Sequence, residues 1–357
     1  MNNTETQAPK ILKESKRKIK VDFERTSRWT RFRVKYLNGG YVANVIFRLC
    51  RFVLLVGVAF VILFPFYSKI SGSLMGPEDF VDVTVKLVPK TLSLDQYKYI
   101  LLENGYVEAF ANTFVLSFLC AALQTLSCCI IAYGFAKFKF KFNSFLFMLV
   151  IFTMVVPHIV LRHAMFMGFA DLDILWIKHI IGGFKGLFTQ GDFMAGWNKA
   201  EGFNLLNSNW PLAILSITGL AYKNGLYIFM LRQFFKGVPD ELEESAYIDG
   251  SGVFRTFVTI IIPLSVPMLL TVFIFAFSWQ WTDNFYTELF YTTGGPTLMP
   301  SIAKVPPSLM KDYAGSTMYN SAIKNTASLL IILPLIILYL FFQKSLVQGI
   351  ERSGITG

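Results

Sequence analysis

The feature that most constrains this chain is a series of six long apolar stretches with few charged residues. They are Val45–Tyr67, Phe114–Phe135, Phe145–Leu161, Trp210–Leu231, Ile260–Trp281 and Thr326–Phe342. A bilayer core about 30 Å thick needs roughly 17 to 25 mostly apolar residues in a helix. The sequence therefore predicts an all-α polytopic membrane protein with six transmembrane helices.

The composition excludes the soluble classes of protein. Of the 357 residues, 54% are hydrophobic, 16% are charged and 36 are phenylalanine. Soluble domains usually carry about 25% charged residues. A single water-exposed core of this size cannot bury so many phenylalanines. Secreted, cytosolic and disordered proteins are therefore excluded.

The net charge of +10 is concentrated in the N-terminal tail, which indicates membrane orientation rather than a nucleic-acid partner. Residues 1–51 hold 13 Lys/Arg and 4 Asp/Glu. Cytoplasmic segments of membrane proteins carry an excess of Lys and Arg. The segments on the side of this tail hold 21 Lys/Arg and the opposite segments hold 11. Both termini and the 232–259 loop are therefore predicted to be cytoplasmic, and no nucleic acid is expected to bind.

Three regions follow from this topology. Residues 1–44 form a basic cytoplasmic tail, 45–342 a six-helix transmembrane domain, and 343–357 a cytoplasmic C-terminal tail. The outer segment between the third and fourth stretches contains the amphipathic run Asp171–Ile181. Trp176 in this run suits a helix at the headgroup level. The aromatic residues Phe193, Trp197 and Phe203 that follow fit either an interfacial belt or a surface that stacks on a ligand.

The sequence contains no recognisable catalytic or cofactor site. It lacks a phosphate-binding loop of the form G-x-x-x-x-G-K-[ST]. The histidines His158, His163 and His179 lie outside any metalloprotease or nucleophile motif, and the four cysteines lie in or beside apolar runs. We therefore predict no enzyme activity, no metal and no cofactor.

Residues 239–251 form an acidic segment on the side where basic residues are expected. Pro239 suits the first position of a helix, and Asp240 and Glu241 complement the helix dipole there. Gly250 can supply a left-handed stop. Three residues at helical spacing form a narrow small and apolar face: Leu242, Ser245 and Ala246. The segment is predicted to be a short helix that lies in a groove of another protein.

The same segment resembles the EAA signature of permease subunits of bacterial ABC importers. The matching residues are Glu244-Ser-Ala, then Gly250, then Ile260-x-Ile-Pro263. Ser245 and Ile262 depart mildly from the usual Ala and Leu. Three further segments are similar to the carbohydrate-uptake, MalG-like branch: Leu231–Pro239, Trp281–Phe285 and Phe341–Ile350.

This resemblance covers about residues 45–357, and it implies a type I (MetI-like) ABC importer permease fold. The partners it implies are a second, MalF-like permease subunit, two ATP-binding ABC ATPase subunits and an extracytoplasmic solute-binding protein that delivers a carbohydrate. The 232–259 loop would couple to the ATPases. Residues of about 168–201 are an insertion relative to the family pattern, and the basic tail is longer than usual.

The site residues that follow fall into two groups. Those expected to couple to the ATPase are Glu243, Glu244, Ser245, Ala246, Asp249, Gly250 and Pro263. Those expected along the substrate path are Lys223, Asn224, Trp279 and Asn284. Lys223 lies nine residues before Arg232, about 13 Å into the membrane at 1.5 Å per residue. It is predicted to face the translocation path, or else to snorkel or pair with a carboxylate of the partner permease.

Three functions remain open at this point. The first is a permease that imports a carbohydrate, with an oligosaccharide favoured, across a bacterial cell membrane. The second is an ABC permease for another solute, because the EAA segment reports the ATPase partner better than the cargo. The third is an ATP-independent secondary transporter, which is expected to have internal repeats and interrupted helices.

Overall fold

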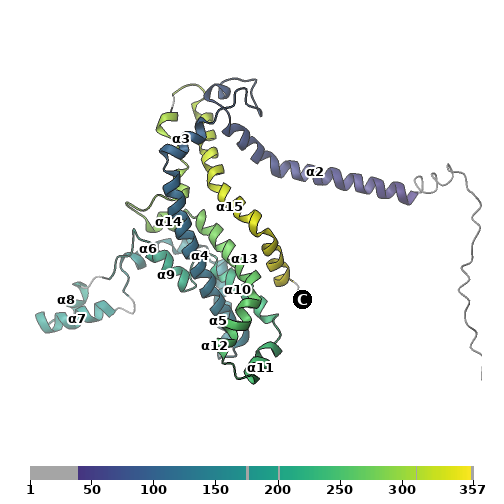
Figure 1. The fold of residues 1–357 in the computed structure, drawn as a ribbon. Coiled ribbons are helices and arrows are strands. Elements are labelled where there is room, and N and C mark those ends of the chain that lie inside the picture. The colour runs from purple at the N-terminus through teal and green to yellow at the C-terminus, as the bar shows by residue number, and fades with distance from the viewer. Residues whose placement is uncertain (1–38, 174–176, 200–201, 311, 355–357) are drawn as a thin grey trace, which may run out of the picture. The chain divides into compact units, whose positions relative to one another are not determined.

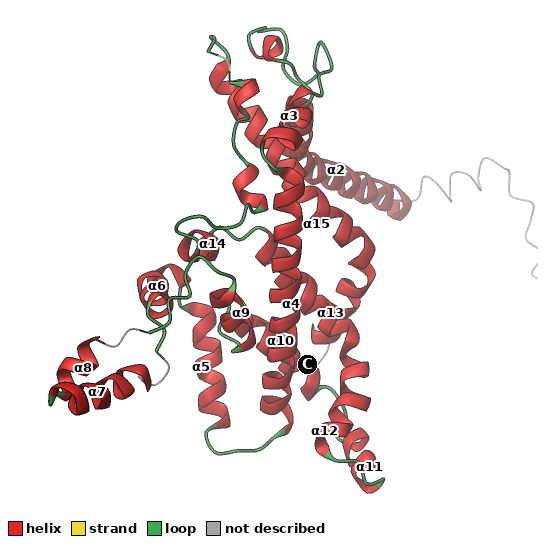
Figure 2. Cartoon of the chain, turned by 60° about the vertical axis from the view of Figure 1, so that its left-hand side comes forward, coloured by secondary structure: helices red, strands yellow, loops and turns green. Residues whose placement is uncertain are grey.

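The structure is a computed structural model that describes residues 39–173, 177–199, 202–310 and 312–354 (Figure 1). The chain consists of two units, Met1–Phe66 and Tyr67–Gly357. Helices make up nearly all the regular structure of the described residues (Figure 2), where the only β-pairing is two isolated bridges. The predicted all-α class is confirmed. Most of the predicted basic tail lies outside the described residues.

Four of the six predicted stretches lie in long, continuous apolar helices. The first, second and sixth lie in α2 (Gly39–Ser73), α4 (Tyr106–Lys137) and α15 (Ser316–Gly354). The fifth lies in α12 (Val253–Thr256), the π-helical turn η4 (Phe257–Ile261) and α13 (Ile262–Trp281), which together form one span. These four helices are long and apolar enough to cross a membrane.

The third predicted stretch is bent rather than straight. Helix α5 (Asn143–Val155) ends before Pro157, and η2 (His158–Leu161) and α6 (Arg162–Ala170) follow. The two parts meet at an angle of 95°. Proline has no N–H and disfavours helical conformation in the residue before it. The prediction of a continuous helix over Phe145–Leu161 was therefore wrong beyond Val155.

The fourth predicted stretch is broken into two helices. Helix α9 (Trp210–Ile217) and helix α10 (Asn224–Lys236) are separated by residues 218–223. Gly219 in this break has φ +76° and Lys223 has φ +68°. Left-handed conformations of this kind end a right-handed helix. The prediction of one continuous helix over Trp210–Leu231 was therefore wrong.

The break lies beside the middle of the apolar stretch of α4. Ser127 of α4 donates a hydrogen bond to the carbonyl of Ser216 (2.8 Å), and the Gln124 amide lies 3.4 Å from the Ser216 hydroxyl. Gln124 is about 20 Å along α4 from Lys137, at 1.5 Å per residue. Because Ser216 is the second-last residue of α9, the break begins at this depth.

Shorter elements connect the spans. They are η1 (Pro77–Phe80), α3 (Asp95–Glu103), α7 (Ile177–Gln190), α8 (Phe193–Lys199), α14 (Phe285–Phe290), η5 (Met299–Ile302) and η6 (Pro307–Leu309). Within the predicted amphipathic run Asp171–Ile181, helix α7 is described from Ile177 and continues to Gln190. Asp173 accepts hydrogen bonds from the backbone of its first turn. Trp176 lies outside the described residues.

The core of the second unit is centred on Trp281, which is fully buried at the end of α13. Its ring stacks on Phe277 at 5.6 Å and meets Phe110 of α4 edge-on at 5.4 Å. Its Nε1–H donates to the carbonyl of Ile331 in α15 at 2.9 Å. One side chain therefore joins three of the spanning helices.

Pro334 inside α15 leaves the carbonyl of Leu330 without its helical donor. The Tyr106 hydroxyl of α4 donates to that carbonyl at 3.3 Å. A neighbouring helix that supplies a donor is one way in which a membrane protein tolerates proline within a span.

We expect Tyr106→Phe to lower the free energy of unfolding by about 0.5–1.5 kcal/mol, because the Leu330 carbonyl loses its donor. Pro334→Ala restores a backbone N–H to that carbonyl. Tyr106→Phe should therefore cost much less in the Pro334→Ala background. Unfolding of the purified protein in mixed micelles measures the four variants, and equal costs in both backgrounds would contradict the assignment.

Candidate functional site

The break in the fourth span opens a small pocket between α4, α9, α13 and α14. Its lining consists of Gln124, Leu212, Leu215, Ser216, Ala221, Tyr222, Ala276, Trp279, Gln280, Asp283 and Tyr286. The pocket encloses about 20 Å³, which is room for about one water molecule. Aromatic rings on one side and amide, hydroxyl and carboxylate groups on the other give it a mixed character.

The aromatic side of the pocket is a connected group of rings. Tyr222 meets Trp279 edge-on at 5.4 Å between ring centroids and Tyr286 at 6.5 Å. His158, from the bend of the third span, lies 4.7 Å from the Tyr222 ring. Its Nδ1 is within 2.8 Å of the Tyr286 hydroxyl. The bend of one span and the break of the next therefore meet at the same place.

Lys223 lies beside this aromatic group. Its Nζ is 4.5 Å from the centroid of the Tyr222 ring and 5.0 Å from that of Trp279. Cation–π attraction stabilises an ammonium group in such a position. Within the described ranges, no carboxylate lies within ion-pair distance of Lys223. The left-handed φ of this residue places the side chain at the N-terminal end of α10.

Asp283 holds one side of the pocket in place. Its carboxylate accepts hydrogen bonds from the backbone N–H of Thr287 at 2.9 Å and of Tyr286 at 3.3 Å. The Thr287 hydroxyl donates a further bond at 3.0 Å. Asp283 therefore fixes the first turn of α14, which carries Tyr286 into the pocket.

The structure brings together two of the four residues predicted along the substrate path. Lys223 and Trp279 lie side by side, whereas the exposed Asn284 is not among the pocket residues. Asn224 is fully buried, and its side-chain amide has no hydrogen-bond partner among the described residues. Tyr222, Tyr286 and Gln124 were missed. Only the position of Tyr222 next to Lys223 could have indicated its role.

The acidic segment on the predicted cytoplasmic side forms α11 (Glu241–Ile248). Asp240 is the N-cap, so Pro239 precedes the cap and does not occupy the first helical position as predicted. The predicted stop is confirmed, because Gly250 has φ +82°. Its N–H bonds the Tyr247 carbonyl at 3.0 Å, and the Ser251 N–H bonds that of Ala246 at 2.9 Å. This pair of bonds is a Schellman motif.

The exposed face of α11 differs from the predicted one. Glu243 and Ala246 are buried against the chain itself. The exposed residues on the opposite face are Glu241, Glu244, Ser245 and Ile248. Ile248 is 86% exposed, and Phe254 in α12 is 78% exposed. The prediction that Ala246 shares an outward face with Leu242 and Ser245 was wrong.

Lys137, the last residue of α4, determines which face of α11 is buried. Its side chain is only 7% exposed, and its Nζ donates to the Val238 carbonyl at 2.8 Å and to Asp240 Oδ1 at 2.6 Å. Glu243 Oε1 lies 3.7 Å away. The hydrogen bond from Lys137 lowers the pKa of Asp240, whereas burial raises the pKa of Glu243. In the sequence, only the positive charge of Lys137 could have indicated this role.

The remaining predicted coupling residues lie close in sequence to α11. Asp249 is the exposed C-cap, and Pro263 is exposed at the second position of α13. The π-helical turn Phe257–Ile261 immediately precedes α13. Glu243, Glu244, Ser245 and Ala246 all lie within α11, and Gly250 ends it.

The chain matches the family model described as "Binding-protein-dependent transport system inner membrane component" over residues 125–352. It is similar to the galactooligosaccharides transport system permease protein GanQ of Bacillus subtilis, with 24% identity over 86% of this chain and 94% of that protein. The arabinooligosaccharides transport system permease protein AraQ of the same organism is 27% identical, over 83% of this chain and 91% of AraQ.

Two other comparisons point to the same kind of transport protein. The alpha-glucoside transport system permease protein AglG of Rhizobium meliloti is 28% identical over 75% of this chain, which spans 62% of AglG. A crystal structure of a bacterial ABC transporter involved in the import of the acidic polysaccharide alginate has a similar fold, with a TM-score of 0.60 at 19% identity. The match covers 85% of this chain and 97% of that chain.

The matched residues include the C-terminal part of α4, the broken fourth span, α11 and nearly all of α15. This agrees with the resemblance that the EAA segment indicates, and it identifies a transport component rather than an enzyme. The chain belongs to the family of inner-membrane components of binding-protein-dependent transport systems.

Proposed function

We propose that this chain is the permease subunit of an ATP-driven ABC importer that moves a carbohydrate, preferentially an oligosaccharide, into the cytoplasm. The observation that carries the proposal is the pocket at the break in the fourth span. Its rings, Tyr222, Trp279 and Tyr286, can stack on the apolar faces of a sugar, while Gln124 and Gln280 can bond its hydroxyl groups.

The relatives support the same class of cargo, since GanQ, AraQ and AglG are named for galactooligosaccharide, arabinooligosaccharide and alpha-glucoside transport. The alternative is an importer of another solute. In that case we would expect a pocket lined by charged groups or by apolar side chains, rather than by aromatic rings and amide groups. The interrupted α9–α10 helix would also suit a secondary transporter. Family membership argues against that class.

The proposed assembly contains a second permease subunit, two ABC ATPase subunits and an external solute-binding protein. Both termini and α11 face the cytoplasm, and α7 and α8 face outside. The exposed face of α11, with Glu244 beside Ile248, docks on an ATPase subunit. The pocket of about 20 Å³ is too small for a sugar. ATP-driven rearrangement therefore has to separate the α9–α10 break from α13 to admit the cargo.

Uptake by the complete complex in proteoliposomes tests the proposal. Labelled neutral and acidic oligosaccharides are supplied with the solute-binding protein, and ATP is enclosed with the ATPase subunits. We expect oligosaccharide accumulation that requires both ATP and the binding protein. Accumulation driven by an ion gradient without ATP, or of amino acids or peptides alone, would overturn it.

Lys223→Met should reduce the rate of oligosaccharide uptake about tenfold or more, because a charged donor typically contributes about 1.5–3 kcal/mol to a hydrogen bond. The complex should still assemble. Lys324→Met, at an exposed lysine of α15, is the matched control and should be neutral. Unchanged uptake kinetics in Lys223→Met would instead assign the lysine to the lipid interface or to the partner permease.

Glu244→Lys should prevent co-purification of the ATPase subunits, since reversal of a charge that is partly buried in an interface costs several kcal/mol. Gly250→Val should have the same effect, because a side chain opposes the left-handed stop. Glu108→Lys reverses an exposed charge in the first turn of α4 and should leave assembly intact. A Glu244→Lys complex that purifies with its ATPases and transports normally would remove α11 from the coupling mechanism.

Lys137→Met should uncouple ATP hydrolysis from transport or release the ATPases, because Glu243 would then be buried without its cation. The double variant Lys137→Met/Glu243→Gln should recover part of the loss. Lys139→Met alters an exposed lysine two residues away and is the control. Wild-type behaviour of Lys137→Met in binding-protein-stimulated ATPase assays would show that this contact does not position α11.

A further inference from the structure

We propose that the helical hairpin formed by α7 and α8 anchors the protein in the outer leaflet of the bilayer. The apolar face of α7 would insert among the lipids beside the transport complex. This hairpin lies within the segment of about 168–201, and neither the pocket nor α11 requires it.

Glycines let the two helices of the hairpin pack closely. A Cβ on Gly183 would lie 2.5 Å from the Phe193 ring of α8, and one on Gly186 would collide with the Gly196 backbone. Gly183 and Gly186 are three residues apart and therefore lie on one side of α7. That side is covered by α8.

Another side of α7 is apolar and largely uncovered, although the Phe184 ring also meets the Phe193 ring of α8 edge-on at 5.6 Å. Its residues are Ile180, Ile181, Phe184, Leu187 and Phe188, all exposed, and Phe188 reaches 85% exposure. Their spacing of i, i+1, i+4, i+7 and i+8 forms one continuous stripe along the helix. Contact with water is unfavourable by roughly 25 cal/mol for each Å² of such surface. A stripe of five large side chains therefore needs an apolar environment.

The charges of α7 fit a membrane surface. Lys178 and Lys185 lie seven residues apart, on one flank of the stripe, and α7 contains no acidic residue. The Lys178 ammonium lies over the Phe203 ring, 3.3 Å from its centroid, whereas Lys185 is exposed. Lysines that border a wide apolar face are typical of helices that lie in the interface and attract anionic headgroups. A surface that binds a folded protein is usually about as polar as the rest of the protein surface. The uninterrupted stripe therefore favours lipid over the solute-binding protein as its occupant.

The hairpin is also continuous with a membrane-spanning element. Helix α6 follows the 95° bend after α5, so α6 runs along the plane of the bilayer when α5 is perpendicular to it. The chain leaves α6 through a short paired neck, in which Leu172 and Phe203 exchange backbone hydrogen bonds of 3.0 and 2.9 Å. The Leu205 N–H also donates to the Phe169 carbonyl at 2.9 Å. The hairpin is therefore tied through its neck to a helix that runs along the plane of the bilayer.

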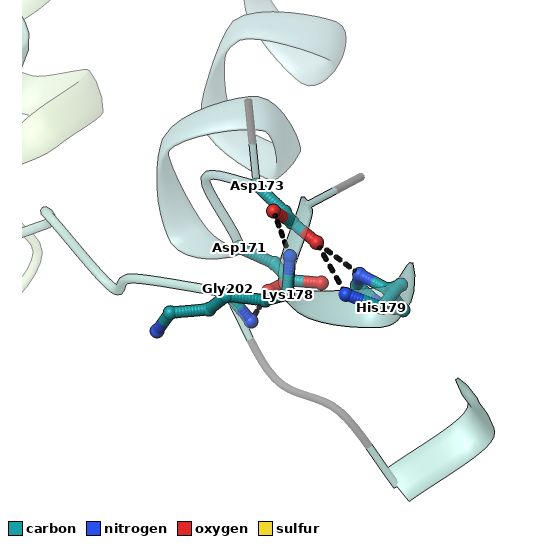
Figure 3. A network of polar contacts seen from close by, with 5 residues as sticks. All are labelled: Asp171, Asp173, Lys178, His179 and Gly202. Carbon is teal, nitrogen blue, oxygen red and sulfur yellow. Dashed lines mark hydrogen bonds and ion pairs between the residues drawn. The ribbon is translucent and has the colours of Figure 1, made fainter. Parts of the chain in front are cut away.

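Side chains at the neck fix the start of α7 (Figure 3). The Asp173 carboxylate accepts hydrogen bonds from the backbone N–H groups of Lys178 and His179, each at 2.9 Å, and lies 2.5 Å from His179 Nδ1. Burial raises the pKa of Asp173, but these bonds outweigh it and lower the pKa overall. Asp171 accepts a bond from the Gly202 N–H across the neck. The base of the hairpin is therefore tied on both sides.

Spin-label accessibility in the full complex tests the proposal. Phe188→Cys and Ile181→Cys are made in a background that lacks the four native cysteines, labelled and reconstituted with the partner subunits in liposomes containing anionic lipid. Lys185→Cys, on the flank, is the matched control. We expect collisions with oxygen to exceed those with a water-soluble nickel chelate at 188 and 181, and the reverse at 185.

Two results would overturn the proposal. Frequent collisions with the nickel chelate at 188 and 181 would place the stripe in water. Few collisions with either reagent would show that a protein surface covers it, and the solute-binding protein or the second permease would then be the occupant. The readout does not depend on transport, so it is independent of the identity of the cargo.

Discussion

Every backbone polar group inside a bilayer needs a hydrogen-bond partner within the protein, and this constraint governs how the spans are arranged. Pro334 leaves the Leu330 carbonyl without a helical donor, and the Tyr106 hydroxyl supplies one. At the end of α9, Ser127 donates to the Ser216 carbonyl. Both of these irregularities therefore receive a hydrogen bond from a polar side chain of α4, which explains why this apolar helix carries Ser127 in its middle.

The same constraint connects the fold to the proposed function. An interrupted helix at mid-membrane depth is tolerated where the exposed backbone lies within protein or lines a cavity. The break at 218–223 lies where α4, α13 and α14 meet, and the polar groups near it are available to a polar cargo. Tyr286 reaches this place because Asp283 holds the first turn of α14. At the C-terminal end of α4, Lys137 orients α11 in a similar way, through its contacts with Asp240 and Glu243.

Hydropathy and local rules could predict much of this structure. The apolar stretches identify the spans, because length and lack of charge are sufficient for a continuous helix such as α4 or α15. Gly250 as the stop of α11 follows from its freedom at positive φ. The break between α9 and α10 could not be predicted in this way, because apolar residues continue on both sides of it and a left-handed Lys223 leaves no trace in composition. The buried face of α11 depends on Lys137, about a hundred residues earlier, so helical spacing alone gave the wrong face.

In the proposed mechanism, the break in the fourth span lines the path of the cargo. The most direct measurement is the rate at which a hydrophilic thiol reagent modifies Ala221→Cys, within the cysteine-free complete complex in proteoliposomes, because Ala221 lines the pocket. If the break lines this path, the reagent should react with the thiol during ATP turnover with the binding protein present. A transported oligosaccharide at saturating concentration should then slow the reaction severalfold. A thiol that stays unreactive in every state, or whose rate does not respond to the cargo, would contradict it.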